Sequence, residues 1–254
     1  MSPVAESASS LAVATRTDDS IAVLTVDGVL DAANSTALRD RLIKATSDAA
    51  SAVILDVSGL KLNAEPAWST FMGAYWQIGS AAHVPIVFVC SNRATREAIT
   101  RSGIAHFMPV YSSQKAAMKS LGQNGRRAVR RADAQLPADL TSLRESRRLV
   151  REWLTTWSQA KLIPVALVVV NVFVENVLEH TAGVPVMRLE AQGATATIAV
   201  SDASNTPAVR LPSPAKGIDV SGLAIVDALS RTWGSTPTGS GKTVWAVIGP
   251  ENQL

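Results

Sequence analysis

Short apolar runs alternate with helix-type patterns along the first half of the chain, and this alternation constrains the fold most. Each run is followed by residues whose apolar positions recur at helical spacing, as Leu38, Leu42 and Ala45 do after the first run. Strands that alternate with helices form a mostly parallel sheet covered by helices. We therefore predict an α/β domain over residues 20–121. Its apolar runs are IAVLTVDGVLD (21–31), AVILDVSGL (52–60), VPIVFVCS (84–91) and FMPVYSS (107–113).

Two local signals refine this pattern. Asp27-Gly28 is a dipeptide typical of hairpin turns, so we predict a turn at that point. Pro66 is suited to the first turn of a helix and predicts a helix over residues 66–82.

A change of texture at residues 122–136 divides the chain. The stretch GQNGRRAVRRADAQ contains glycines and many charges but few apolar residues, which is typical of a linker. We predict a flexible N-terminus over residues 1–19, the first domain over 20–121, a basic linker over 122–136 and a second domain over 137–254.

The second domain has a different order of elements. Residues 140–157 form an amphipathic helix pattern with Leu143, Leu149 and Trp153 inward, and a long apolar helix pattern follows at 162–180. Helices on one face of a mixed sheet form an α+β sandwich, which is the fold we predict here. The later candidates are strands at 184–191, 195–202 and 243–249 and a helix at 222–233.

Composition limits the location of the protein. Apolar residues make up 47% of the chain and charged residues 18%, which suits a soluble, well-packed protein. Cys90 is the single cysteine, so the chain has no intramolecular disulfide and a reducing cytoplasm is expected. The first twenty residues lack the features of a signal peptide, and the apolar run 163–173 is too short to cross a bilayer. We expect a cytoplasmic protein with no membrane partner.

The positive charge is local. The formal net charge is +3, and Arg126, Arg127, Arg130 and Arg131 against Asp133 account for the same excess (4 − 1) within one short segment. A surface that follows nucleic-acid phosphates needs a broader basic face, so nucleic-acid binding is not expected.

The string GSGKT at residues 239–243 looks like the end of a phosphate-binding P-loop. A P-loop needs a glycine five residues before Gly241, where Thr236 stands, and a helix after the lysine. Here a strand pattern, VWAVIG, follows, the preceding TWGSTP reads as a helix end, and eleven residues remain after Thr243. We therefore predict a turn that leads into a final strand.

Four motifs in the second domain resemble those of the GHKL, or Bergerat-fold, ATP-binding domain, most of all the small anti-sigma-factor serine kinases of bacteria. The resemblance covers about residues 137–250. The motifs are NVFVENVLEH (171–180), VSDAS (200–204), SGLAIVDALSRTWG (221–234) and GSGKTVWAVI (239–248).

This resemblance implies a bound ATP or ADP with magnesium. It implies that Asn176 holds the magnesium ion, that Asp202 accepts the amino group of adenine, and that Gly222, Gly241 and Thr243 lie near the nucleotide. An amide oxygen is a suitable magnesium ligand. Without the resemblance, Asn176 is equally consistent with a solvent-exposed residue on a helix, and Asp202 with a turn-forming residue.

The chain departs from the kinase pattern at the expected general base. The family has a glutamate four residues before the asparagine, where this chain has Val172, which accepts no proton. Glu175 is rotated by about 100° around the helix from Asn176, and Glu179 lies a turn too late. The first glycine of the lid motif is replaced by Val220. We predict a pseudokinase; the alternative is an active serine/threonine kinase that uses another base.

Residues 20–121 resemble the STAS domain of anti-sigma-factor antagonists. The motifs are VDGVLDAANSTALRDRL, LDVSGLKLNAEPAWSTF and VFVCSNRATREAITRSGIAHFMPVYSSQKAAM. The resemblance implies that Glu65 occupies the position of the phosphorylated serine, and that Asp31 and Asn34 lie near the partner-binding edge. Glu65 then acts either as a fixed negative charge that imitates phosphoserine or as an acid that favours a helix start.

Together these resemblances imply a bacterial regulator of sigma-factor activity that works by partner switching. The expected partners are a sigma factor, an anti-sigma factor or a STAS protein, with intramolecular contact between the two domains and homodimer formation as further expectations. A scaffold that ignores nucleotide is a third alternative.

Overall fold

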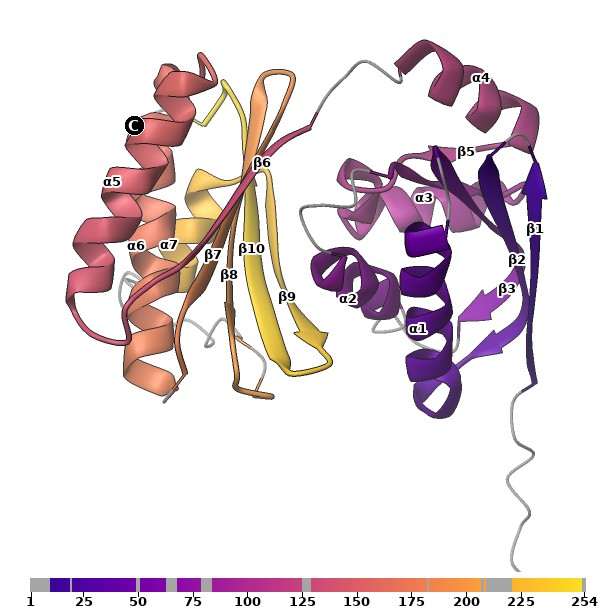
Figure 1. Ribbon diagram of the computed structural model, residues 1–254, viewed down its shortest axis with the longest axis horizontal. Coiled ribbons are helices and arrows are strands. Elements are labelled where there is room, and N and C mark those ends of the chain that lie inside the picture. The colour runs from indigo at the N-terminus through magenta and orange to yellow at the C-terminus, as the bar shows by residue number, and fades with distance from the viewer. Residues whose placement is uncertain are drawn as a thin grey trace, which may run out of the picture. The chain divides into compact units, whose positions relative to one another are not determined.

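The computed structural model describes most of the chain. The described residues are 10–18, 20–48, 51–62, 68–78, 84–124, 129–181, 183–206, 208 and 221–252. The chain divides into two compact units, Met1–Gly125 and Arg126–Leu254, and the ribbon in Figure 1 labels the elements of each.

The first unit is built on a five-stranded sheet with the strand order β1-β2-β3-β4-β5. Its edge strand β1 pairs antiparallel with β2, and all later neighbours are parallel. This arrangement confirms the predicted mostly parallel sheet. The strands are β1 (Leu11–Asp18), β2 (Ile21–Leu30), β3 (Ala52–Leu62), β4 (Ile86–Val89) and β5 (Val110–Tyr111).

Helices of the first unit cover both faces of its sheet. Phe88 of β4 packs edge-to-face against Phe71 of α2, while its neighbours Val87 and Val89 pack in a cluster with Ala117 of α4. Because successive strand residues point to opposite faces, α2 and α4 lie on opposite sides of the sheet. The helices are α1 (Ala32–Asp48), α2 (Ser69–Gln77), α3 (Arg93–Arg101), the short η2 (Ile104–His106) and α4 (Gln114–Asn124).

The predicted inward face of α1 is confirmed, but two predictions for the N-terminal strands are wrong. Leu38, Leu42 and Ala45 are buried as expected. Residues 11–18, assigned to a flexible N-terminus, form the edge strand β1. Asp27-Gly28 is not a turn, because Gly28 lies inside β2 opposite Leu11 and a side chain there would overlap the carbonyl oxygen of Ser10.

The second unit contains a five-stranded sheet in the order β6-β7-β8-β10-β9. All four pairings are antiparallel, so the predicted mixed sheet is wrong in this respect. The short β7–β8 and β9–β10 connections account for two of these pairings, since antiparallel neighbours need only a hairpin. The strands are β6 (Arg130–Gln135), β7 (Val186–Gln192), β8 (Thr195–Asp202), β9 (Thr232–Thr238) and β10 (Gly241–Ile248).

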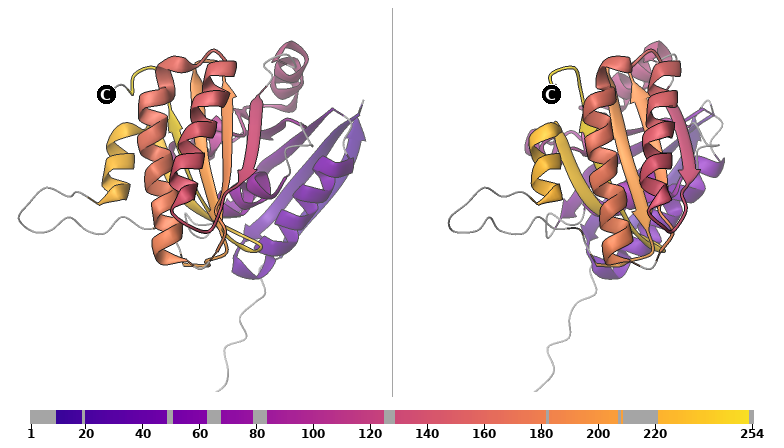
Figure 2. Two further views of the ribbon diagram at one scale, coloured as in Figure 1. Left: turned by 60° about the vertical axis from the view of Figure 1, so that its left-hand side comes forward. Right: turned by 90° about the vertical axis from the view of Figure 1, so that its left-hand side faces the viewer.

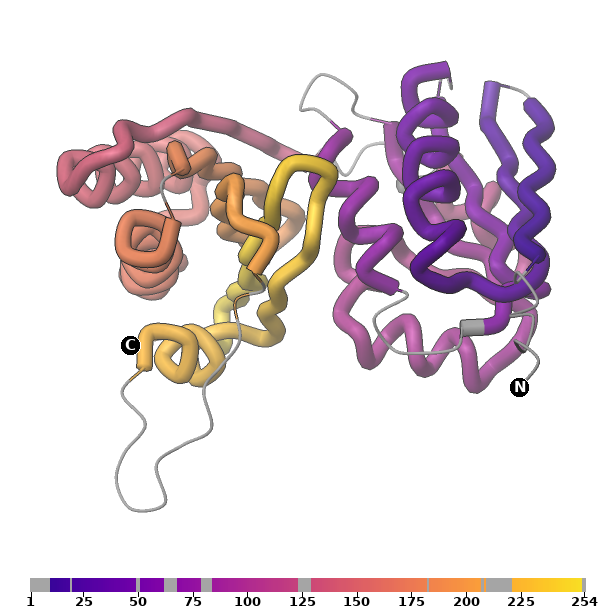
Figure 3. The backbone as a smooth tube through the Cα atoms, turned by 90° about the horizontal axis from the view of Figure 1, so that it is seen from below, coloured from indigo at the N-terminus to yellow at the C-terminus, as the bar shows by residue number. Residues whose placement is uncertain are grey.

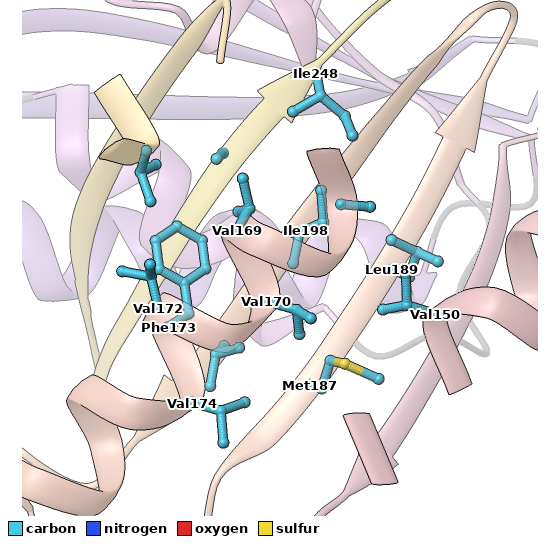
Figure 4. Close-up of a cluster of buried hydrophobic side chains, with 14 of the residues drawn as sticks. Val150, Val169, Val170, Val172, Phe173, Val174, Met187, Leu189, Ile198 and Ile248 are labelled. Carbon is cyan, nitrogen blue, oxygen red and sulfur yellow. The ribbon is translucent and has the colours of Figure 1, made fainter. Parts of the chain in front are cut away.

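Helices α5, α6 and α7 cover one face of this second sheet, as the two views in Figure 2 show. The central helix α6 supplies most of the core: Val169, Val170 and Phe173 pack against Ile198 of β8 and Ile248 of β10 (Figure 4). This confirms helices on one face and the buried apolar helix. The helices are α5 (Thr141–Thr156), the short η3 (Ala160–Leu162), α6 (Ile163–His180) and α7 (Gly222–Leu229).

Helix α6 also has the length and apolar composition of a membrane span. Residues Ala160–His180 have a mean hydropathy of 1.9, and half of the tested window is buried inside the structure. A buried core helix passes the same test of length and composition, and α6 packs in the core of the second unit.

Part of the predicted basic linker is a strand. Residues 130–135 form β6 at the sheet edge, where Arg131 pairs with Glu190 and Asp133 pairs with Arg188 at 2.6 Å. Two of the charges that indicated a linker, Arg131 and Asp133, are therefore cross-strand partners of residues in β7. Arg126 and Arg127 lie outside the described residues.

Two further predictions for the second unit need correction. The deeply buried positions of α5 are Ser142, Ser146, Val150 and Leu154, while the predicted residues Leu143, Leu149 and Trp153 are partly buried beside them. The TWGSTP segment is strand β9 rather than a helix end, and Figure 3 shows it running beside β10. GSGKT is therefore the turn of this hairpin and the start of β10, so the segment leads into a strand rather than a helix.

Candidate functional site

Asp202, the last residue of β8, is bonded within its own domain. Its Oδ2 lies 2.9 Å from the Nζ of Lys242, and its Oδ1 accepts hydrogen bonds from that Nζ at 3.0 Å and from the Ser204 N–H at 2.6 Å. The Asp202 side chain is 2% exposed and the Lys242 side chain 10%. The pair therefore forms a buried ion pair at the end of the sheet.

Strand register places this ion pair on the helix-covered face. Lys242 stands directly opposite Asp202 in the ladder between β10 and β8. Val200 and Val244, two residues further along each strand, belong to the core under the helices. Since side chains two residues apart share a face, Asp202 and Lys242 point to the same side as this core.

Thr243 is not brought together with Asp202. As the next residue along β10, it points to the opposite face of the sheet. There its Oγ1 lies 2.7 Å from the Oγ of Ser201, and the two hydroxyls form a hydrogen bond. The partner of Asp202 is instead Lys242, the residue before Thr243.

Helix α6 brings Val172 against the start of α7. Val172 is 8% exposed, and a Cβ placed on Gly222 would come within 2.8 Å of its Cγ1. Asn176 lies one helical turn further along α6 on the same side. Its Nδ2 is buried and has no hydrogen-bond partner among the described residues. At residue 172, where a general base was expected, the chain thus has a buried apolar side chain that contacts Gly222.

The acidic residues near Asn176 do not replace that base. Glu175 accepts a hydrogen bond from Asn171 Nδ2 at 3.0 Å, and Asn171 in turn accepts one from Arg147 of α5 at 3.2 Å. These bonds direct Glu175 toward α5, in agreement with its predicted rotation around the helix. The Glu179 side chain is 70% exposed.

The adenine-binding role of Asp202 does not fit this geometry. Both carboxylate oxygens already accept bonds from Lys242 or Ser204, and a buried carboxylate releases such partners at a high free-energy cost. For Asn176 the atom without a partner among the described residues is the buried Nδ2, whereas the predicted magnesium role uses the amide oxygen. Within the described residues no group of three or more His, Cys, Asp or Glu could hold a metal ion. Val220 lies outside these residues.

In the first unit, Asp31 and Asn34 form a reciprocal cap at the start of α1. Asp31 Oδ1 accepts the N–H groups of Ala33 at 2.9 Å and Asn34 at 3.1 Å, while Asn34 Oδ1 accepts the Asp31 N–H at 3.1 Å. Asn34 Nδ2 also donates to the Val29 carbonyl at 2.9 Å. This arrangement gives both residues a structural role, and their role in partner binding stays a prediction.

Polar residues at the end of the β3–β4 pairing were not among the predicted site residues. Asp56 accepts the Ser58 N–H at 3.0 Å, and the Ser58 hydroxyl accepts the Ser91 N–H at 3.0 Å. Parallel sheets commonly bind ligands beyond the carboxyl ends of their strands, so the ends of the two predicted strands pointed to these residues. Glu65 follows β3 in the chain and lies outside the described residues.

Comparison with known families identifies the first unit. Residues 12–117 match the family model described as the STAS domain. This span begins at the second residue of β1 and contains β2 to β5 and the helices between them. The first unit is therefore a STAS domain, and it begins earlier than the predicted residue 20 because β1 belongs to it.

Several solved structures are similar to part of the chain. An anti-sigma factor antagonist from Mycobacterium paratuberculosis is 21% identical, with 44% of this chain and 95% of that chain covered and a TM-score of 0.39. The unphosphorylated form of the anti-sigma factor antagonist SpoIIAA is 17% identical, with 44% of this chain and 97% of that chain covered and a TM-score of 0.35. A STAS-domain protein from Planctomyces limnophilus is 12% identical, with 43% of this chain and 96% of that chain covered and a TM-score of 0.36. No curated protein matches the chain.

Proposed function

We propose that this protein regulates sigma-factor activity by partner switching, and that it acts by protein binding rather than by phosphoryl transfer. The observation that carries the proposal is the STAS match over residues 12–117. The motifs of the second unit resemble those of anti-sigma-factor serine kinases. A chain that joins these two kinds of domain is suited to binding partners from one regulatory system.

The second unit is proposed to be a degenerate GHKL domain. Its antiparallel sheet with helices on one face is compatible with that resemblance. The buried contact between Val172 and Gly222 argues against catalysis, because no carboxylate occupies the position of the expected base. The Asp202–Lys242 ion pair argues against ordinary adenine binding.

The proposed partners are an anti-sigma factor, a sigma factor or another STAS protein in a bacterial cytoplasm. Association of the two units of one chain and formation of a homodimer are part of the same proposal. A short tether raises the effective concentration of one domain near the other to about millimolar, so intramolecular association competes with foreign partners.

Phosphoryl transfer is tested with the full chain, magnesium, labelled ATP and purified STAS proteins. We expect no labelled STAS protein, and we expect Asn176→Ala to leave this background unchanged. Transfer that disappears in Asn176→Ala would instead establish the active kinase. Val172→Glu, with Val172→Gln as the uncharged control of similar size, tests whether a base alone is missing.

Partner binding is tested with purified anti-sigma factors and their sigma factors, measured by calorimetry. If Glu65 imitates phosphoserine, the wild type corresponds to the phosphorylated form, which its partner releases. Glu65→Ser removes this negative charge and should therefore increase the affinity for an anti-sigma factor. An affinity equal to that of the wild type would assign Glu65 to helix stabilisation. No binding to any anti-sigma factor, sigma factor or STAS protein would overturn the proposed function.

A further inference from the structure

We propose that Lys242 is a built-in occupant of the Asp202 carboxylate and blocks that carboxylate to ligands that carry an amino group. This inference rests on the proposed function, because it concerns the site that a GHKL-like domain would use for adenine. It goes further by assigning an inhibitory role to a residue of this chain.

The contacts engage both oxygens of the Asp202 carboxylate. The ammonium of Lys242 lies within 3.0 Å of both oxygens of Asp202, and the Ser204 N–H adds a third bond to Oδ1. An exocyclic amino group donates the same kind of hydrogen bond that the ammonium already donates. Because the Asp202 side chain is 2% exposed and both of its oxygens are engaged, a ligand has to displace Lys242 to reach the carboxylate.

The backbone holds Lys242 in this place. Gly241 precedes it with a φ of 152°, and a side chain at Gly241 would overlap the carbonyl oxygen of Asp202. The close approach of the two strands then sets Lys242 opposite Asp202 in the ladder. Because the lysine belongs to the same chain, it competes with any free ligand at a high effective concentration.

Displacement is also opposed by burial. Removing one partner of a buried ion pair leaves an uncompensated charge, which is strongly unfavourable. A neutral amino group compensates the charge of Asp202 less well than an ammonium does. The wild-type protein should therefore keep its ion pair at millimolar adenosine or ADP.

The test measures binding of adenosine and ADP to the full chain by calorimetry, with purine riboside as the control ligand. Lys242→Met removes the ammonium and keeps most of the stem, and Lys161→Met changes an exposed lysine of the same unit. We expect adenosine to bind Lys242→Met at least about tenfold more tightly than the wild type or Lys161→Met. Purine riboside, which has a hydrogen atom in place of the exocyclic amino group of adenosine, should gain nothing.

A double variant assigns the gain to Asp202. Asp202→Leu combined with Lys242→Met replaces the ion pair by apolar side chains, a change that buried pairs often tolerate. We expect this double variant to lose the adenosine binding gained by Lys242→Met. Equal adenosine affinity in the wild type and Lys242→Met, or an equal gain for purine riboside, would overturn the proposal.

Amine labelling of the wild-type protein gives a test that does not depend on the folding of a variant. Acetic anhydride followed by peptide mass spectrometry should label Lys161 faster than Lys242, with or without ADP. Faster labelling of Lys242 in the presence of ADP would show displacement and overturn the proposal. Failure of the partner-binding experiments would leave these results unaffected, so the two proposals fail separately.

Discussion

Val172 of α6 packs directly on Gly222, the first residue of α7, and a methyl group on Gly222 would lie 2.8 Å from Val172 Cγ1. Real Cβ atoms essentially never approach a heavy atom this closely. The approach of the two helices thus depends on the absence of a side chain at residue 222. The same contact explains why position 172 carries an apolar residue in this protein.

Gly222→Ala should lower the free energy of unfolding of the second unit by about 1–3 kcal/mol, because the added methyl displaces a buried β-branched side chain. The cost should shrink in a Val172→Ala background, which a double-mutant cycle by urea unfolding measures. Gly122→Ala in α4 is the control. It meets nothing within 4 Å, and the higher helix propensity of alanine should stabilise by up to about 1 kcal/mol. Equal changes in the free energy of unfolding for Gly222→Ala and Gly122→Ala would contradict the close contact between Val172 and Gly222.

Ser142→Ala should stabilise the second unit by about 1 kcal/mol. The Ser142 hydroxyl is buried and has no hydrogen-bond partner among the described residues, so its removal relieves a desolvation cost. Ser146, one turn later on the same buried face, donates to the Leu143 carbonyl at 3.2 Å. Ser146→Ala is the matched control and should be neutral or destabilising. A loss of stability in Ser142→Ala, read from urea midpoints, would reveal a bonded hydroxyl.

Asp31→Ala should destabilise the STAS domain by about 0.5–2 kcal/mol, since the variant leaves the N–H groups of Ala33 and Asn34 without their acceptor. Asp31→Asn keeps an acceptor oxygen and should retain most of the stability. The partner-binding prediction is separable from this one. If Asp31 contacts a partner through its charge, Asp31→Asn weakens binding to an anti-sigma factor while its unfolding curve stays close to the wild type.

Glu251 should show an acid-shifted titration. Hydrogen bonds from Arg231, one of them from Nη2 at 2.7 Å, lower the pKa of Glu251 from 4.5 to about 2. A carboxyl with a lowered folded-state pKa stabilises the fold above the unfolded value near 4.5. This contribution is lost as the pH falls toward 2. Carboxyl NMR should show the pKa of Glu251 returning toward 4.5 in Arg231→Gln; an unchanged pKa would rule out the pair in solution.

Local patterns were sufficient for most helices and strands of both units. Leu38, Leu42 and Ala45 recur at helical spacing and are buried in α1, because a single helix face determines that outcome. The Asp27-Gly28 turn failed for the opposite reason. Its propensity is local, whereas pairing with β1 on one side and β3 on the other holds Gly28 inside β2, with a positive φ of 114° that glycine tolerates.

The candidate site divides in the same way. The lack of an acid at residue 172 and the position of Asn176 relative to it follow from the sequence, since helical periodicity relates neighbours four residues apart. The ion pair between Asp202 and Lys242 does not follow from it, because forty residues separate the two side chains in the chain. Only the antiparallel register of β8 and β10 brings them together.

By itself, the sequence determined the alternating pattern of the STAS domain, the apolar character of α6 and the valine where a base was expected. Each of these depends on residue type and short-range spacing. The tertiary structure alone decided that residues 130–135 pair as β6, that Thr243 faces away from Asp202, and that Lys242 satisfies this carboxylate. These are outcomes of strand register, which depends on contacts between residues far apart in the chain.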